Sequence, residues 1–185
     1  MTTHTVLLIS GALRKGSMNR KLLAEAALIY EGDAIIADLD LPLYNGDVED
    51  SEGFPPAVQT LFDQIANADA VVISTPEYNK SFSGVLKNAL DWVSRIKGNP
   101  WKDKPVAIIS AADSRGGGER AQYALRLAMN PFRARVLPGP EVAVAKAKDE
   151  FDENGRLTNE RYLKQLGILM RQLHAEAEAR RAADL

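Results

Sequence analysis

Three segments of the sequence combine glycine with charged, polar or aromatic side chains in a way that suits a phosphorylated ring compound. They are "SGALRKGSMN" (residues 10–19), "TPEYNKSFSG" (residues 75–84) and "SAADSRGGGERAQ" (residues 110–122). A phosphate group needs cations and backbone N–H donors. A planar ring needs an apolar wall and a few fixed polar contacts along its edge. The three segments together offer both kinds of contact.

The first segment has the composition of a phosphate-binding loop. Gly11 and Gly16 let the backbone bend closely around a ligand, and Ser17 suits the N-cap of a following helix. Arg14 and Lys15 add positive charge next to the N-terminus of that helix, which itself attracts anions. The segment matches neither GxGxxG nor GxxxxGK[ST], so it predicts neither a dinucleotide nor a nucleoside triphosphate. The alternative is an ordinary turn with a solvated basic pair.

The second and third segments suit the ring of such a ligand. Tyr78 supplies a flat aromatic face, while Glu77 and Asn79 supply hydrogen-bonding groups. Composition alone favours a ring-binding loop only slightly over an ordinary long loop. Glu77 as a catalytic base is a further interpretation, but no second carboxylate or histidine completes a mechanism. The three glycines at 116–118 permit close backbone approach, or form a flexible turn.

The residues that the chain lacks also restrict its chemistry. It has no cysteine, which excludes disulfides, thiolate nucleophiles, iron–sulfur clusters and cysteine zinc sites. Its two histidines, His4 and His174, are interpreted as surface or packing residues, so we predict neither a catalytic triad nor a metal site. With no catalytic side chain evident, a bound cofactor is expected to carry the chemistry. A mononucleotide with a ring system, such as FMN, fits the three segments better than a dinucleotide.

Length, charge and hydropathy describe a soluble globular protein. The chain has 185 residues, 45% of them hydrophobic, and a formal net charge of −2. This charge gives no electrostatic case for nucleic acid or an anionic membrane as a partner. The apolar run near the N-terminus is too short for a signal sequence or a membrane span. We therefore expect one cytoplasmic domain over residues 1–185.

Short apolar runs alternate with helical patterns along the chain. Strands are expected at residues 5–10, 33–39, 69–74, 104–110 and 141–146, and helices at 19–30, 55–68, 85–95, 120–129 and 159–182. Continuous apolar strands that alternate with helices predict a parallel sheet covered on both faces, here a doubly wound α/β domain. Ligands of such sheets lie beyond the carboxyl ends of the strands. The three polar segments follow the first, third and fourth strands.

Longer motifs around these segments resemble a known family. "SGALRKGSMNRKLL", "PEYNKSFSGVLKNALDWVSR" and "GGGERAQYALR" together resemble the NADPH-dependent FMN reductases, which include quinone, chromate and azo-dye reductases. The resemblance extends from about Thr5 to Glu141. It implies a flavodoxin-like three-layer sandwich with a five-stranded parallel sheet of order 2-1-3-4-5. It also implies FMN as cofactor and NADPH, or NADH, as electron donor.

The resemblance further implies a role for particular residues. Ser10, Arg14, Ser17 and Asn19 would hold the FMN phosphate, Pro76 to Asn79 would line the ring and ribityl chain, and the turn Ser114 to Gly117 would approach the other ring edge. The expected cofactor-binding set is Ser10, Arg14, Ser17, Met18, Asn19, Pro76, Glu77, Tyr78, Asn79, Ser114, Arg115 and Gly117.

Three positions depart from the family pattern. Ala12 and Ser114 stand where the family usually has Ser and Gly, and Ser83 stands where it usually has Pro. The departures bear on FMN affinity and substrate preference. The resemblance also implies a homodimer or homotetramer with the flavin near the subunit interface, where residues 84–95 and 120–123 are candidate contacts.

Three functions compete at this point. The first is an FMN-dependent NAD(P)H oxidoreductase that passes electrons to a quinone, azo compound, metal oxyanion or free flavin. The second is a flavodoxin-type electron carrier without its own NADPH activity. Such carriers generally have a Thr/Ser-rich phosphate loop without Arg and a strongly acidic surface, which this chain lacks. The third is a family member that has lost its flavin, for which Ala12 is the only hint.

Overall fold

The centre of the protein is a parallel sheet with the predicted strand order. The computed structural model describes residues 4–183. The first four strands are β1 (Thr5–Ser10), β2 (Asp33–Ala37), β3 (Ala70–Ser74) and β4 (Pro105–Ala111). The order across the sheet is β2-β1-β3-β4, followed at the β4 edge by two short strands at Arg135–Val136 (β5) and Val142–Val144 (β6), and every pair is parallel. The prediction of a flavodoxin-like doubly wound sheet is therefore confirmed.

The strand predicted at 141–146 is present as β6 (Val142–Val144), which pairs with β4. A further short strand, β5 (Arg135–Val136), also pairs with β4 and was not predicted. Between them the chain leaves the ladder through Pro138 and a cis Gly139–Pro140 bond. Proline has no N–H to donate to a neighbouring strand, so this stretch cannot continue the pairing. The interruption separates the pairing at Pro105 and Val106, near the start of β4, from the pairing at Ile109 to Ala111, at its carboxyl end.

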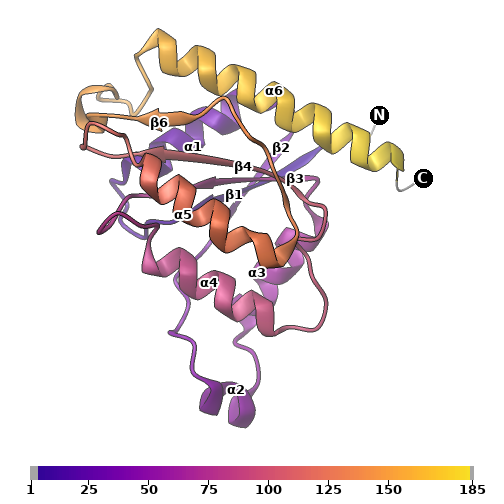
Figure 1. The fold of residues 1–185 in the computed structure, drawn as a ribbon. Helices are drawn as coiled ribbons and strands as arrows, with labels where there is room; N and C mark the ends of the chain where they lie inside the picture. Colours follow the sequence, from indigo (N-terminus) through magenta and orange to yellow (C-terminus); the bar gives the residue numbers. More distant parts are fainter. Residues whose placement is uncertain (1–3, 184–185) are drawn as a thin grey trace.

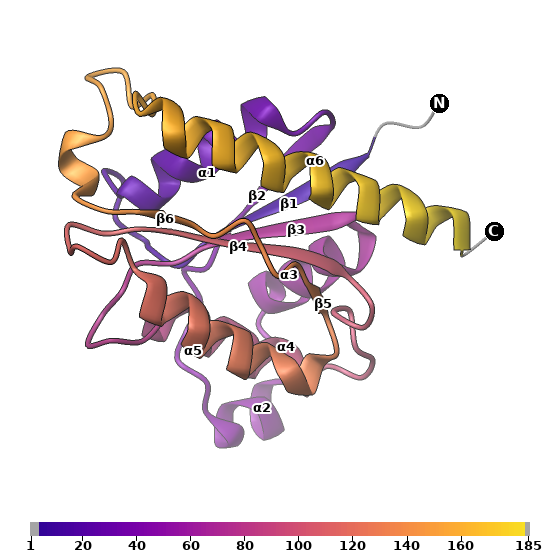
Figure 2. The ribbon, with the colours of Figure 1, turned by 45° about the horizontal axis from the view of Figure 1, so that its top comes forward.

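Helices cover both faces of the sheet (Figures 1 and 2). The first layer holds α1 (Met18–Ile29) and α6 (Glu160–Ala183), and the second holds α3 (Pro56–Asn67), α4 (Gly84–Arg95) and α5 (Glu119–Met129). Two short 3-10 helices, η1 (Asn130–Phe132) and η2 (Ala147–Asp149), lie in the connections. The predicted helices are confirmed, with ends that differ by one residue. Among the helices of residues 4–183, none is long and apolar enough to cross a membrane.

Alternation along the strands divides the core into two clusters. Val6 and Leu8 of β1 pack toward α1 and α6, whereas Leu7 and Ile9 pack toward α3 and α4. Successive side chains of a strand point to opposite faces, so an unbroken apolar run fills both layers at once. This is why the strands read as continuous apolar runs in the sequence.

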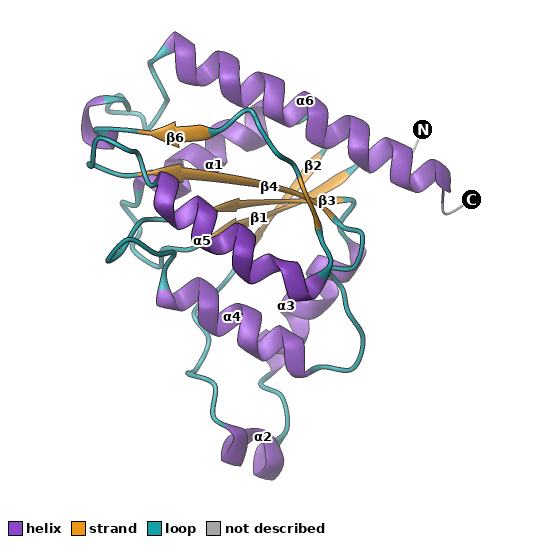
Figure 3. Ribbon diagram, in the orientation of Figure 1, coloured by secondary structure: helices purple, strands orange, loops and turns teal. Residues whose placement is uncertain are grey.

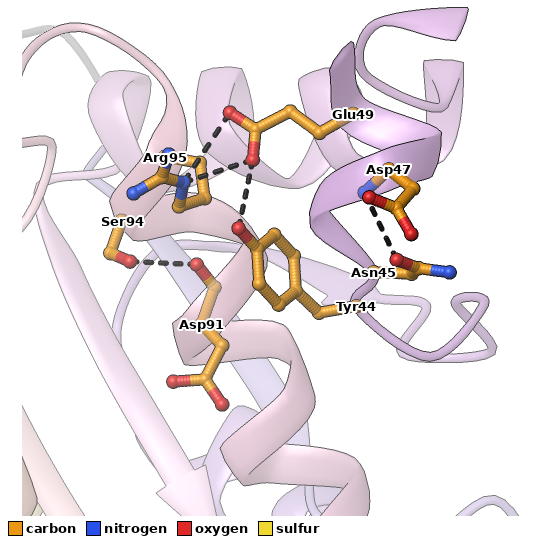
Figure 4. Close-up of polar contacts among 7 residues, drawn as sticks. All are labelled: Tyr44, Asn45, Asp47, Glu49, Asp91, Ser94 and Arg95. Atoms are coloured by element: carbon orange, nitrogen blue, oxygen red, sulfur yellow. Dashed lines mark hydrogen bonds and ion pairs between the residues drawn. The ribbon is translucent and has the colours of Figure 1, made fainter. Parts of the chain in front are cut away.

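An arm between β2 and α3 contains a helix that the sequence pattern did not predict. This helix, α2 (Gly46–Glu52), has no buried residue and hence no apolar periodicity to reveal it. It projects from the layer of α3, α4 and α5 (Figure 1). Figure 4 shows its attachment: Glu49 accepts hydrogen bonds from Tyr44 Oη at 3.0 Å and Arg95 Nε at 2.9 Å. The bond from Arg95 lowers the pKa of the Glu49 carboxyl.

The two leucines Leu173 and Leu28 lie in the same helical layer, and we expect their replacement by alanine to change the free energy of unfolding by very different amounts. Leu173 of α6 is fully buried, while Leu28 of α1 is 67% exposed. We expect Leu173→Ala to reduce the free energy of unfolding by about 2–5 kcal/mol because it leaves a cavity. Leu28→Ala should change it by less than about 0.5 kcal/mol. Urea unfolding followed by circular dichroism measures both, and equal effects would contradict the assignment of α6 to the core.

Candidate functional site

A pocket of about 220 Å³ lies beyond the carboxyl ends of β1, β3 and β4. The strands end at this edge of the sheet, where connecting loops gather (Figure 3). Seven residues predicted from the sequence line the pocket: Arg14, Ser17, Met18, Asn19, Pro76, Glu77 and Tyr78. The first two polar segments therefore meet in one place, as a ligand site at the topological switch point requires.

One end of the pocket has the features of an anion site. Ser17 caps α1, and its Oγ accepts a hydrogen bond from the Asn19 amide at 3.2 Å. The N-terminal turn of α1 carries partial positive charge. Arg14 is exposed beside it, with a contact of 3.3 Å from Nη2 to the Gly16 carbonyl. That contact is to a neutral carbonyl, so the guanidinium keeps its other donors for an anion.

Asn19 joins α1 to two strands under the pocket. Its Oδ1 accepts hydrogen bonds from Ser74 Oγ and the Ala111 amide, both at 2.9 Å, and its Nδ2 donates to the Ala111 carbonyl at 2.9 Å. The side chain is 3% exposed. Its amide thus lines the floor of the pocket, and its oxygen is already taken by protein donors. We assign Asn19 to positioning of the α1 N-terminus.

Ser10 has a similar supporting place behind the first loop. It is buried, and its Oγ bonds to both the carbonyl and the amide of Ala12, at 3.1 and 3.2 Å. Arg20 Nε also donates to the Ala12 carbonyl, at 3.0 Å. Ser10 does not line the pocket, whereas the methyl group of Ala12 does. Hydrogen bonds of Ser10 and Arg20 with the Ala12 backbone therefore stabilise the first loop. The Ala12 side chain has no hydroxyl to offer a ligand.

The second loop is shaped by a tight turn. Tyr78 and Ser81 exchange two backbone hydrogen bonds of 3.0 Å, and the two residues between them have φ values of 51° (Asn79) and 65° (Lys80). Two consecutive positive φ angles define a type I′ turn, in which Asn is a favoured residue. Asn79 is exposed and does not line the pocket. Turn geometry alone accounts for it.

Glu77 immediately precedes this turn, and Tyr78 is its first residue. Tyr78 is 58% exposed at the rim of the pocket. Glu77 Oε2 accepts a hydrogen bond of 3.4 Å from the Ala121 amide in the first turn of α5. A carboxylate is stabilised at a helix N-terminus. Gly118, the N-cap residue of α5, has no side chain for that task. This contact places Glu77 as a helix-capping group rather than a base.

The sequence of this chain is similar to a family of flavin-dependent reductases. The family model for NADPH-dependent FMN reductases matches residues 4–149. An NAD(P)H-dependent FMN reductase from Pseudomonas aeruginosa is 47% identical over 159 residues, 84% of this chain and 85% of that protein. The chain belongs to the NADPH-dependent FMN reductase family.

Other relatives agree. A quinone reductase from Escherichia coli K12 is 42% identical over 151 residues, with 80% of each chain covered. The structure of a flavoenzyme NAD(P)H:(acceptor) oxidoreductase from Paracoccus denitrificans has a TM-score of 0.85 and 33% identity, covering 95% of this chain and 98% of that one. A flavodoxin, WrbA-like protein from Agrobacterium tumefaciens (TM-score 0.64, 15% identity) shares the fold. The resemblance read from the sequence motifs is confirmed.

The third loop of this reductase reaches the pocket only at its start, through Ala111, Ala112 and Asp113, while its glycine turn lies beside the pocket. Ser114 and Arg115 are exposed and outside the lining, and Arg115 faces a separate cavity of about 460 Å³. Gly117 has φ of 59°, and a Cβ there would lie 2.5 Å from the Ala143 backbone. The absence of a side chain at Gly117 therefore allows the backbone of this turn to pack closely against β6.

Two lining residues of the reductase had no sequence signal. Ala147 and Lys148 reach the pocket because the Ala147 amide donates to the Ala112 carbonyl at 3.2 Å, which extends the β4–β6 pairing. Lys148 Nζ lies 2.6 Å from Asp113 Oδ2, and this hydrogen bond lowers the pKa of the Asp113 carboxyl. The lysine brings a second cation to the pocket from a segment about 130 residues beyond Arg14.

A larger cavity of about 530 Å³ lies elsewhere in the reductase. Its lining comes from the outer face of α4 and the segments around Trp101 and Phe132, at the opposite end of α4 from the pocket. None of the predicted site residues lines it. Position at the carboxyl edge therefore makes the smaller pocket the candidate functional site.

The bridging role of Asn19 predicts a cost for its removal. Asn19→Ala leaves the Ser74 hydroxyl and both backbone groups of Ala111 without this partner. Each buried group left unpaired costs about 1–3 kcal/mol. Asn67→Ala is the matched control, because Asn67 is exposed at the end of α3. Urea unfolding should show a large loss for Asn19→Ala only; similar values for both variants would remove Asn19 from its positioning role.

Proposed function

We propose that the protein is an FMN-dependent NAD(P)H oxidoreductase that transfers electrons to a quinone or a related small acceptor. FMN bound in the pocket would accept hydride from NADPH or NADH and then reduce the acceptor, which is a quinone, azo compound, metal oxyanion or free flavin. The observation that carries this proposal is the pocket in which an anion site and an aromatic rim meet at the carboxyl edge. Dependence on NAD(P)H fits the cytoplasmic single-domain protein expected from the sequence.

The residues present fit FMN at its phosphate end. Among residues 4–183, Arg14 supplies a cation without a carboxylate partner, Lys148 supplies one already paired with Asp113, and Ser17 with the N-terminus of α1 supplies N–H donors and a hydroxyl. Pro76 and Met18 give apolar surface, and Tyr78 gives an aromatic face at the rim. Ser10, Asn19 and Asn79 would act indirectly in this assignment, by holding the loops, and Ser114, Arg115 and Gly117 would lie beside the ring edge.

The chain itself would bind and orient the reactants. Cysteine is absent from the sequence and neither histidine lines the pocket, so no side chain there is suited to move protons near neutral pH. Glu77 is engaged with the first turn of α5. The protein would position the cofactor and stabilise its charge: cations would bind the phosphate, and the rim would leave one face of the ring open to NAD(P)H and to the electron acceptor.

The pocket of one chain is small for the whole cofactor. Its volume of about 220 Å³ is below the range of roughly 300–1,000 Å³ that encloses most drug-sized ligands. Part of the ring would therefore extend beyond the pocket past the exposed Tyr78. A second subunit that completed this wall would explain the exposed Tyr123 and Leu127 of α5, 55% and 72% accessible. We therefore include a homodimer or homotetramer in the proposal.

A flavodoxin-type carrier or an FMN-binding protein without its own NADPH activity remains the second candidate. The fold is common to both, so the discriminating property is steady turnover. We expect the purified protein to show a flavin spectrum that bleaches on addition of NADPH, and to oxidise NADPH continuously when a quinone is added. Absorbance at the flavin and NADPH bands measures both steps. A flavin spectrum without NADPH oxidation would identify a carrier, and failure to take up added FMN would remove both candidates.

Arg14 allows a direct test of where the phosphate lies. A hydrogen bond to a charged group is worth about 1.5–3 kcal/mol, so Arg14→Ala should weaken FMN binding by about 10- to 100-fold. Lys15→Ala is the matched control, since Lys15 is the neighbouring exposed cation and does not line the pocket. Fluorescence quenching of FMN on titration with apoprotein gives the two affinities. An unchanged affinity for Arg14→Ala would place the phosphate elsewhere.

A further inference from the structure

A second cluster of ligating side chains lies at the opposite edge of the sheet, where β1 begins and the last turns of α6 pass (Figures 1 and 2). His4 precedes β1 and stacks on His174 of α6, with ring centroids 4.5 Å apart and an interplanar angle of 23°. Glu178 Oε2 lies 4.0 Å from His174 Nδ1. One donor atom from each of the three residues lies within 4.8 Å of the others.

This cluster contains polar groups without a partner. His4 Nδ1 and Tyr30 Oη are buried and accept or donate no hydrogen bond. The Tyr30 ring lies 5.4 Å from that of His174, so both groups belong to the same cluster. Buried polar atoms in native proteins nearly always have a partner, and an exception calls for an ion, a water or a function. A lone packing role for His4 leaves its nitrogen unexplained.

Burial lowers the pKa of His4 and so favours the neutral imidazole, which is the form that ligates metals. Burial lowers the pKa of His4 most, and the charges of Arg181 and His174 lower it further, against the opposing carboxylates of Asp69 and Glu178. Arg181 itself forms an ion pair with Asp69, in which its Nε and Nη2 lie 2.6 and 2.9 Å from the two carboxylate oxygens. Its charge is thus partly offset before an ion approaches.

The backbone holds the three residues in place. The His4 carbonyl accepts a hydrogen bond of 2.8 Å from the Asp33 amide, and a Cβ at Gly32 would lie 2.3 Å from the same oxygen, so β2 fits closely against it. His174 and Glu178 are four residues apart on α6 and share one face of the helix. Between them lies Ala177, 1% exposed, which packs α6 onto the core.

We propose that His4, His174 and Glu178 bind one divalent transition-metal ion, with Zn²⁺ as the best fit. Two imidazoles and one carboxylate are a donor set that Zn²⁺ accepts, and the fourth position is left for water. Tetrahedral Zn²⁺ with bonds of about 2.0–2.1 Å brings its donors roughly 3.3 Å apart. The two imidazoles are stacked with nearly parallel planes, so both rings would turn about their side-chain bonds, and the exposed Glu178 would rotate, to bring the three donors to one ion. The ion would join α6 to the start of β1, far from the flavin pocket.

The test is a titration of the protein as purified, after treatment with EDTA and its removal. Calorimetry with ZnCl₂ should show one equivalent bound, and MgCl₂ should show none because Mg²⁺ prefers oxygen ligands. His174→Gln and Glu178→Gln should each weaken binding at least tenfold. Glu176→Gln is the matched control, since Glu176 is an exposed carboxylate on α6 whose recorded partner is the exposed Arg135 at 4.0 Å; it should bind Zn²⁺ as the wild type does.

Thermal unfolding gives a second readout. At a hundredfold excess of Zn²⁺ over Kd, the wild type should gain about 5–10 °C in Tm. Glu178→Gln alters an exposed side chain, so it tests the site even if His174→Gln fails to fold. FMN affinity should be the same in all variants. Absence of saturable one-equivalent binding in the wild type, equal stabilisation by Mg²⁺, or full Zn²⁺ affinity in Glu178→Gln and His174→Gln would overturn the proposal.

Discussion

The buried amide of Asn19 holds together the parts of the structure on which the site depends. It is the first polar side chain within α1, and it bonds to the ends of β3 and β4 through Ser74 and Ala111. These bonds bring the positive end of the helix over the carboxyl edge of the sheet, where a phosphate can use it. The strand order exposes this edge of the sheet, and Asn19 fixes the N-terminus of α1 beside it.

Several residues that resemble ligand contacts in the sequence are supports in the structure. Ser10 bonds within its own loop, Asn79 occupies a left-handed turn position, and Gly117 fits against β6. Motif residues therefore divide into those that touch a ligand and those that shape the loop. Both kinds matter for binding, because a loop displaced by 1 Å no longer aims its donors.

The two ends of the sheet serve different purposes in the functions proposed here. The carboxyl edge has the open pocket, while the opposite edge has a group of two imidazoles and one exposed carboxylate between α6 and the start of β1. The long α6 helix is bound to the core through apolar contacts along most of its length. A metal ion at its far end would add to stability without contact with the redox site.

The sequence by itself determined the parallel sheet and five of the six α-helices of residues 4–183, because apolar periodicity is a property of neighbouring residues. Its long local motifs determined the family, and the family resemblance supplied the strand order. The sequence also predicted that Arg14, Ser17 and Tyr78 lie close together, since loops after the strands of a parallel sheet meet at one edge, and these residues do line one pocket. Only the tertiary structure decided the rest. The split edge strand, the place of Lys148 in the pocket and the stacking of His4 on His174 depend on pairing between distant segments. No local pattern records such contacts.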